Sequence, residues 1–440
     1  MTFLARRPVY LLVVAVLFTT IFSWFRINTW CIIPLLACRL WMDGPMNTLR
    51  TAFTNKLFLA YFIYCVIGAA GLFYTHNPTA GANLVAKDAT LTAMAFIFCA
   101  GPFADAREYR KLITAYSLVV FAASVYCLAV ALTHYLHLKD RGIFFYHDLT
   151  APIGQNAVFY SVYVLFAMQF LLSPEGNPEI TFLSAGAKKW YRIFLIAFFL
   201  LMIVLLSSKL ILVLALLMLV NFFIKNLYSA RNRRWLVVAA LAASGLVAVL
   251  VVTDNPVRRR FEVMAKGEIK PPPRNEINII TPFNALQLRL LEWEFAVEIL
   301  NEHHAWIFGV SAGDSQDLLD QKYIDNHMYI GDPAEGPHRK VRGYIGYNFH
   351  NQYIQTLVHS GVIGLASLLA IVALLAGIAL KWKTKEARFT VLTLLIFFIP
   401  EAPLTMQHGI FLFVFFPLLL LYSPSKKGNA PGAHISASQL

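Results

Sequence analysis

The chain has 440 residues, of which 58% are hydrophobic and only 14% are charged, and its mean hydropathy is +0.60. Its apolar runs repeatedly reach the length that a helix needs to cross a bilayer, which argues against a water-soluble protein and predicts an all-α polytopic membrane protein. The formal net charge is +13 at pH 7, and its distribution indicates how the chain is oriented.

Hydropathy and helix-breaking residues divide the chain into twelve expected spans. The first follows Arg6 and Arg7 without a small-residue cleavage site, so we expect a retained helix. The seventh and eighth form one apolar run, broken only at Ser207, Ser208 and Lys209, where we expect a tight turn. The twelve spans are residues 8–25, 27–42, 56–75, 84–103, 111–133, 155–173, 191–206, 209–227, 235–253, 352–380, 389–405 and 409–422.

Basic residues should collect in cytoplasmic loops, which tests this topology. With the N-terminus inside, 21 of the 37 Lys and Arg residues fall on the cytoplasmic side. Residues 254–348 then lie outside, and they carry 14 acidic and 11 basic residues. Because the basic excess is cytoplasmic, it orients the protein and does not indicate a nucleic-acid partner. Both termini are expected in the cytoplasm.

The expected domains follow this topology. Residues 1–253 hold spans one to nine, 254–349 form an outer loop domain, 350–422 hold spans ten to twelve, and 423–440 form a cytoplasmic polar tail. Within the loop, residues 286–306 are predicted to be helical, and FGVSAGD (308–314) is expected to be a turn. The apolar stripe expected on that helix is Leu286, Leu290, Trp293, Val297 and Leu300.

All five cysteines lie in the first 127 residues, within or at the ends of apolar spans. The outer loop therefore has no disulfide framework and no CxxC metal site.

Ionisable residues at a membrane are costly unless they are paired or solvated, so they are functional candidates. Lys139 and Arg141 precede span six, although they could also snorkel to lipid phosphates. Lys209 stands between two very apolar spans and needs an anion or water. The five candidates on the outer side are Lys139, Arg141, Lys209, Arg289 and His350.

Two of these candidates have specific alternatives. Arg289 lies in the loop helix and could pair with Glu292 one helical turn on, or stack on Trp293. His350 opens span ten, where an imidazole with a pKa near neutral can accept a proton from a hydroxyl nucleophile. It could also simply cap the helix.

The spacing around His350 adds context. His350 and Asn351 are followed, after nine residues, by Gly361-Val-Ile-Gly364. This pattern resembles the H-[NSQ]-x9-GxxG signature of the O-antigen ligase family, bacterial membrane proteins that join O-polysaccharide to the lipopolysaccharide core. The resemblance extends to the twelve spans, the loop between spans nine and ten, and an arginine followed by tryptophan and a Gly-containing turn.

Two positions depart from the family pattern. The turn between spans seven and eight more often has arginine after serine, whereas this chain has Lys209 after Ser208, so a point charge replaces a bidentate phosphate ligand. The loop turn has Ser311 where glycine is more usual.

The resemblance implies a GT-C-like glycosyltransferase of the bacterial inner membrane with a periplasmic active site. Its donor would be undecaprenyl diphosphate-linked O-antigen, its acceptor a sugar hydroxyl of lipid A-core, and no nucleotide sugar, ATP, metal or other cofactor would be needed. Our hypothesis is that His350 is the general base of an inverting transfer, and that Arg289 and Lys209 stabilise the leaving diphosphate. Lys139 and Arg141 would join this diphosphate site. Arg258, Arg259 and Arg260 are expected to anchor the chain at the interface and could hold lipid A phosphates.

Two alternatives stay open. O-antigen polymerases and protein O-oligosaccharyltransferases share the signature and the donor, and differ in the acceptor. A transporter of a polyprenyl lipid or an anionic solute belongs to another class. Against it, the sequence lacks halves with matching interrupted helices, and its outer polar residues gather on one side of the membrane.

Overall fold

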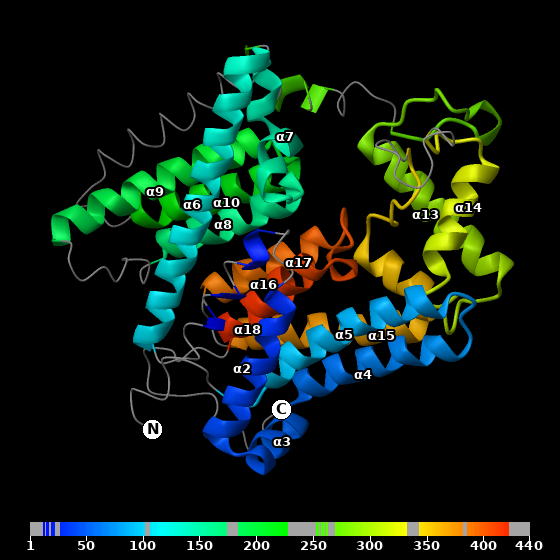
Figure 1. Cartoon of the computed structure of the whole chain (residues 1–440), viewed down its shortest axis with the longest axis horizontal. Helices are drawn as coiled ribbons and strands as arrows, with labels where there is room; N and C mark the ends of the chain where they lie inside the picture. Colours follow the sequence, from blue (N-terminus) through cyan, green and yellow to red (C-terminus); the bar gives the residue numbers. More distant parts are fainter. Residues whose placement is uncertain are drawn as a thin grey trace. The chain divides into compact units, whose positions relative to one another are not determined.

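The computed structural model describes most of the chain between residues 12 and 421. Every regular element in these residues is a helix, so the predicted all-α class is confirmed for the part that the structure covers (Figure 1). The residues described are 12–13, 15–16, 19–22, 27–101, 106–173, 184–227, 252–253, 255, 257–259, 261–262, 269–331, 343–381 and 385–421.

Within these ranges, five helices are long and apolar enough to cross a membrane, and a bent pair, Tyr146–Ile153 with Ala157–Leu172, makes a sixth candidate. Three shorter apolar helices lie at Lys209–Ile224, Ala387–Phe397 and Gln407–Leu418. These helices identify an integral membrane protein. The count of twelve stays a prediction, because expected spans 8–25 and 235–253 fall largely outside the described residues.

The chain forms two compact units, the first built from residues 1–38, 104–265 and 423–430. The polar break expected in its apolar run is confirmed, because α9 stops at Leu206 and Ser207 adopts a left-handed conformation before Lys209 opens α10. The elements of this unit are α6 (Ala106–Leu138), η2 (Arg141–Phe144), α7 (Tyr146–Thr150), η3 (Ala151–Ile153), α8 (Ala157–Leu172), α9 (Ala185–Leu206) and α10 (Lys209–Leu227). Helix α2 (Ile27–Asp43) runs across the boundary between the units.

The second unit comprises residues 39–103, 266–422 and 431–440. It joins early helices to the outer loop and to the last helices of the chain. Its elements are α3 (Pro45–Thr54), α4 (Lys56–Ala70), η1 (Gly71–Phe73), α5 (Pro78–Cys99), η5 (Arg274–Glu276), α13 (Ala285–Glu302), α14 (Ser315–Asp325), α15 (Gln352–Lys381), α16 (Lys385–Phe397), η7 (Pro403–Thr405), α17 (Gln407–Ile410), η8 (Phe411–Phe415) and α18 (Phe416–Leu421).

Helices from distant parts of the sequence pack together in this second unit. Helix α4 packs against both α5 and α15, and Figure 1 draws these three helices side by side. Helix α13 packs against α14 and α15. The loop core includes Phe295, Tyr323, Phe349 and Val358, the last of which belongs to α15. Since each buried apolar side chain contributes about 1.5–3 kcal/mol, this shared core holds the loop against α15.

The two compact units are defined by contacts between residues, whereas the expected domains are defined by where the chain crosses the membrane. The division at 253, 349 and 422 therefore stays a prediction.

Candidate functional site

Helix α13 carries the first half of the site. Asn284 caps it, and Asn284 and Gln287 form a reciprocal capping box. The expected apolar stripe was wrong in phase, because Val297 is exposed and only Leu300 of that set is buried. The buried face is instead Leu288, Leu291, Glu292, Phe295, Ala296, Ile299 and Leu300. A carboxylate thus occupies a core position.

The turn before α15 carries the second half. His350 has a positive φ of 44°, which is uncommon for a residue with a side chain, and its backbone N donates to Asn348 Oδ1 at 2.8 Å. Asn351 Oδ1 accepts from the backbone N of Tyr353 and Ile354, the pattern of an N-cap. The helix-capping role considered for His350 therefore falls to Asn351, and the imidazole can make other contacts.

Gln352 and Gln355 hold this turn in place. The backbone N of Gln352 donates to Phe398 O at 2.8 Å, and its side-chain Oε1 accepts from Leu404 N at 2.8 Å. Gln355 Oε1 accepts from Phe349 N at 3.2 Å. The polar residues around His350 thus satisfy buried backbone groups, as they must in a low-dielectric interior.

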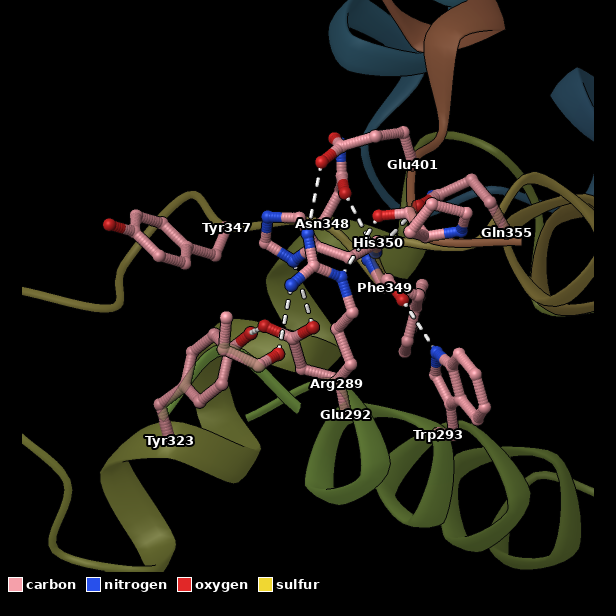
Figure 2. Close-up of polar contacts among 12 residues, drawn as sticks. Arg289, Glu292, Trp293, Tyr323, Tyr347, Asn348, Phe349, His350, Gln355 and Glu401 are labelled. Carbon is pink, nitrogen blue, oxygen red and sulfur yellow. Dashed lines mark hydrogen bonds and ion pairs between the residues drawn. The ribbon is translucent and has the colours of Figure 1, made fainter. Parts of the chain in front are cut away.

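The imidazole of His350 meets Glu292 (Figure 2). His350 Nδ1 lies 2.8 Å from Glu292 Oε2, and Tyr323 Oη donates to Glu292 Oε1 at 3.0 Å. The side chain of Glu292 is 0% exposed, whereas that of His350 is 22% exposed. Because a carboxylate only accepts, Nδ1 carries the proton in this pair and Nε2 is left as the basic nitrogen of a neutral ring.

The charges around His350 favour the protonated form of its imidazole. Burial lowers the pKa of His350, but the hydrogen bond and the negative charge of Glu292 outweigh it, so the pKa is raised above its usual value. The charge of Glu401 raises this pKa further, while that of Arg289 lowers it. Burial and the charge of Glu292 raise the pKa of Tyr323 well above its usual value, so the phenol remains a donor.

Arg289 lies beside this pair and is held by a second acidic residue (Figure 2). Its Nη2 donates to Glu401 Oε1 at 2.9 Å, its Nε to Pro400 O at 2.9 Å and its Nη1 to Ala285 O at 2.8 Å. The side chains of Arg289 and Glu401 are both mostly buried. The alternative pairing of Arg289 with Glu292 is wrong, because Glu292 turns towards His350.

Trp293 also differs from the expectation that it could stack with Arg289. Its Nε1 donates to Phe349 O at 3.0 Å, which fixes the backbone directly before His350. One helix therefore provides the guanidinium, the carboxylate and a brace for the turn that carries the imidazole.

The glycine signature has a structural role at a break in α15. Ser360 and Gly361 depart from helical geometry, and a Cβ on Gly361 would lie 2.1 Å from Ile307 O. The loop turn docks there, since Val310 N and Ser311 N donate to Val358 O and His359 O at 2.9 and 3.1 Å. Ser311 has a φ of 80°, which explains why glycine suits this position.

The remaining predicted site residues lie in the first unit. Lys139 and Arg141 are exposed, with Lys139 Nζ 5.9 Å from the centre of the Tyr135 ring, and Lys209 is half-buried at the start of α10. Their grouping around a diphosphate stays a prediction.

The predicted acceptor arginines also belong to the first unit. Arg258 Nε bonds Glu262 Oε1 at 2.9 Å, Arg259 follows it, and Arg260 lies outside the described residues. In the described residues, no three His, Cys, Asp or Glu side chains gather as a metal site would require.

Sequence reasoning missed Glu292 as the partner of His350, and it missed Glu401 and Tyr323. A signal for Glu292 was present, because it interrupts an apolar series with helical spacing, Leu288, Leu291, Phe295 and Ile299. An acid on such a face indicates a buried polar partner.

Comparison with known proteins agrees with the sequence pattern. Residues 194–369 match the family model described as O-Antigen ligase, a range that runs from α9 into α15 and contains Arg289, Glu292 and His350. No curated protein matches the chain. The predicted family resemblance is thereby confirmed.

Proposed function

We propose that this chain, a member of the O-antigen ligase family through residues 194–369, transfers O-polysaccharide from undecaprenyl diphosphate to a sugar hydroxyl of lipid A-core. The observation that carries the proposal is the fully buried Glu292, which lies 2.8 Å from Nδ1 of a partly exposed His350. A carboxylate behind an imidazole orients the ring and stabilises its protonated form, which suits a general base.

The transfer begins when His350 Nε2 takes the proton of the acceptor hydroxyl. The hydroxyl oxygen bonds to the anomeric carbon of the donor sugar as the bond from that carbon to the diphosphate oxygen breaks. The electron pair leaves with undecaprenyl diphosphate, so the anomeric configuration inverts. Glu292 balances the positive charge on the imidazolium, and the proton is later released to solvent.

Arg289 is placed to stabilise the leaving group. A guanidinium has five N–H donors, and Glu401, Pro400 and Ala285 each accept one from Arg289. The other two are proposed to bind diphosphate oxygens as negative charge develops, because fixed donors stabilise a transition state most when they need not reorganise. Glu401 keeps the guanidinium in place.

Lys139, Arg141 and Lys209 are proposed to complete the diphosphate site, and Arg258, Arg259 and Arg260 to bind lipid A phosphates. This assignment rests on charge type and on the outer side of the expected topology. The proposed site is periplasmic, the membrane is the bacterial inner membrane, and both termini are cytoplasmic.

The test uses a strain that lacks this protein and displays O-polysaccharide when complemented with the wild type. Lipopolysaccharide is resolved on gels, and undecaprenyl-linked polymer is assayed in parallel. His350→Ala should lose all capped bands and accumulate lipid-linked polymer. The matched control is His303→Ala, an exposed histidine in the same unit, which should cap normally.

Other outcomes lead elsewhere. A core that carries one repeat unit would indicate a polymerase. An unchanged ladder in the strain lacking the protein would refute the ligase and direct attention to protein glycosylation or transport.

A further inference from the structure

An apolar surface is exposed where the outer loop meets the spanning helices. Phe73 is 93% exposed at the end of η1, and Ile307 and Phe308 are 59% and 64% exposed in the turn that follows α13. Trp306 and Tyr74 are also exposed, and Tyr74 Oη donates to Phe308 O at 2.7 Å. We call these five residues the apolar rim. Large apolar side chains gathered in this way mark a surface that binds another apolar phase.

The apolar rim is fixed rigidly to α15. Val362 N donates to Trp306 O at 2.8 Å, and Ile363 N donates to Ile307 O at 3.4 Å. Gly361 permits this approach, because any Cβ there would collide with the backbone of Ile307. The rim therefore lies at the break in α15, where the straight part of the helix begins.

Two helix lengths place this break at a membrane surface. Helix α15 has 30 residues, and the 20 from Val362 to Lys381 span about 30 Å at 1.5 Å per residue, the thickness of a hydrocarbon core. The apolar helix Lys56–Phe73 has 18 residues and ends at the same rim. Both helices reach their outer ends beside Phe308.

The apolar character continues from the rim onto the spanning helices. Val362 and Ile363 are exposed where α15 leaves the rim, and Val66, Ile63 and Phe62 are exposed progressively further from it along α4. Exposed apolar side chains on both spanning helices would contact lipid. Because the apolar rim continues this surface, it would contact lipid as well. Trp and Tyr at its edge fit the interfacial zone, where an apolar ring with a polar atom is favoured.

We propose that the apolar rim inserts into the outer leaflet and anchors the outer loop to lipid acyl chains. The anchor would hold the end of α13 at a fixed height above the bilayer, and so fix Arg289 and Glu292 against a donor whose reacting bond lies at head-group depth. The insertion itself does not depend on the reaction catalysed.

The test reconstitutes the full chain in vesicles of phosphatidylcholine and phosphatidylglycerol. A cysteine-free variant, checked for the melting temperature of the wild type, receives Phe308→Cys or Phe73→Cys with an environment-sensitive fluorophore. The quencher is a lipid with a nitroxide near the carbonyl end of its acyl chain. The matched control is Gln321→Cys, an exposed polar position on α14.

Labels on the rim should emit at shorter wavelength and be quenched at least about twofold more than the control, since interfacial apolar groups sit about 5–10 Å into the boundary. Equal quenching and water-like emission at all three sites would overturn the proposal. If the cysteine-free chain does not fold, the same labels are placed in the native chain, and the signal of its labelled parent is subtracted.

Discussion

Replacing Glu292 with glutamine removes one negative charge from the site and almost no volume. Glutamine Oε1 can still accept from His350 Nδ1, and its amide can donate to Tyr323 Oη, so packing is preserved. However, the variant lacks the negative charge that outweighs the effect of burial on the pKa of His350. The pKa of His350 should therefore fall, and the neutral imidazole should be a weaker base.

The pH dependence follows from this sign. His350 acts as a base only when neutral, so wild-type activity rises as pH increases through its raised pKa, above the usual value of about 6.5. In Glu292→Gln this acid limb should move to lower pH. The maximal rate should fall roughly a hundredfold, at the lower end of what general base catalysis contributes.

The assay is single-turnover transfer from undecaprenyl diphosphate-linked glycan to lipid A-core by purified protein in nanodiscs, measured between pH 5 and 9. Glu294→Gln is the matched control, because Glu294 lies on the same helix but is exposed and pairs with Arg274. A normal rate with an unshifted acid limb in Glu292→Gln would refute the role of Glu292. A lowered rate with an unshifted acid limb would mean that Glu292 contributes only to packing.

Three further predictions follow from the geometry. Arg289→Ala should raise the activation free energy by about 3 kcal/mol, which lowers the maximal rate roughly a hundredfold. Arg289→Lys should recover only part of the rate, because the three N–H donors of lysine lie on one nitrogen and lack the planar fork of a guanidinium. Wild-type kinetics in Arg289→Ala would contradict this reasoning. Gly361→Ala should lower the melting temperature in nanodiscs, because the added Cβ would lie 2.1 Å from Ile307 O and φ is +63°. Gly377→Ala in the same helix meets open space and should leave the melting temperature unchanged. Equal melting temperatures for the two variants would count against the docked turn. Asp314→Asn should destabilise the chain at pH 7, and this effect should shrink as the pH falls below the usual pKa of a carboxyl group. Burial raises the pKa of Asp314, but hydrogen bonds from Thr75, His76 and Asn77 outweigh it and lower that pKa, so the stabilisation is present above the unfolded pKa and lost as pH falls through the folded one. Asp325→Asn is the exposed control, and chemical denaturation at pH 7 and at successively lower pH measures the difference.

Local sequence patterns indicated the family and one helix boundary correctly. The spacing of His350 and Gly361 indicated the family, and the apolar run with Ser207 and Ser208 showed where α9 ends. Each of these signals lies within a few turns of one helix. Such patterns depend on helix propensity and hydropathy, so they can be recognised without knowledge of the fold.

Other parts depended on the phase of a helix. The outer-loop helix was predicted, but its buried face was placed wrongly, and Glu292 was considered only as a possible partner of Arg289. A helix with charged residues on several faces allows more than one apolar stripe, and only packing against α14 and α15 selects one.

The sequence by itself determined the class of protein, the positions of most apolar helices and the imidazole that could act as a base, because hydrophobicity and residue chemistry are local properties. The tertiary structure alone decided the partners. Glu292 is 58 positions from His350, and Glu401 is 112 positions from Arg289. Since no periodicity links residues so distant, only tertiary packing brings each pair together: α13 packs against α15 and joins Glu292 to His350, and the segment after α16 brings Glu401 to Arg289.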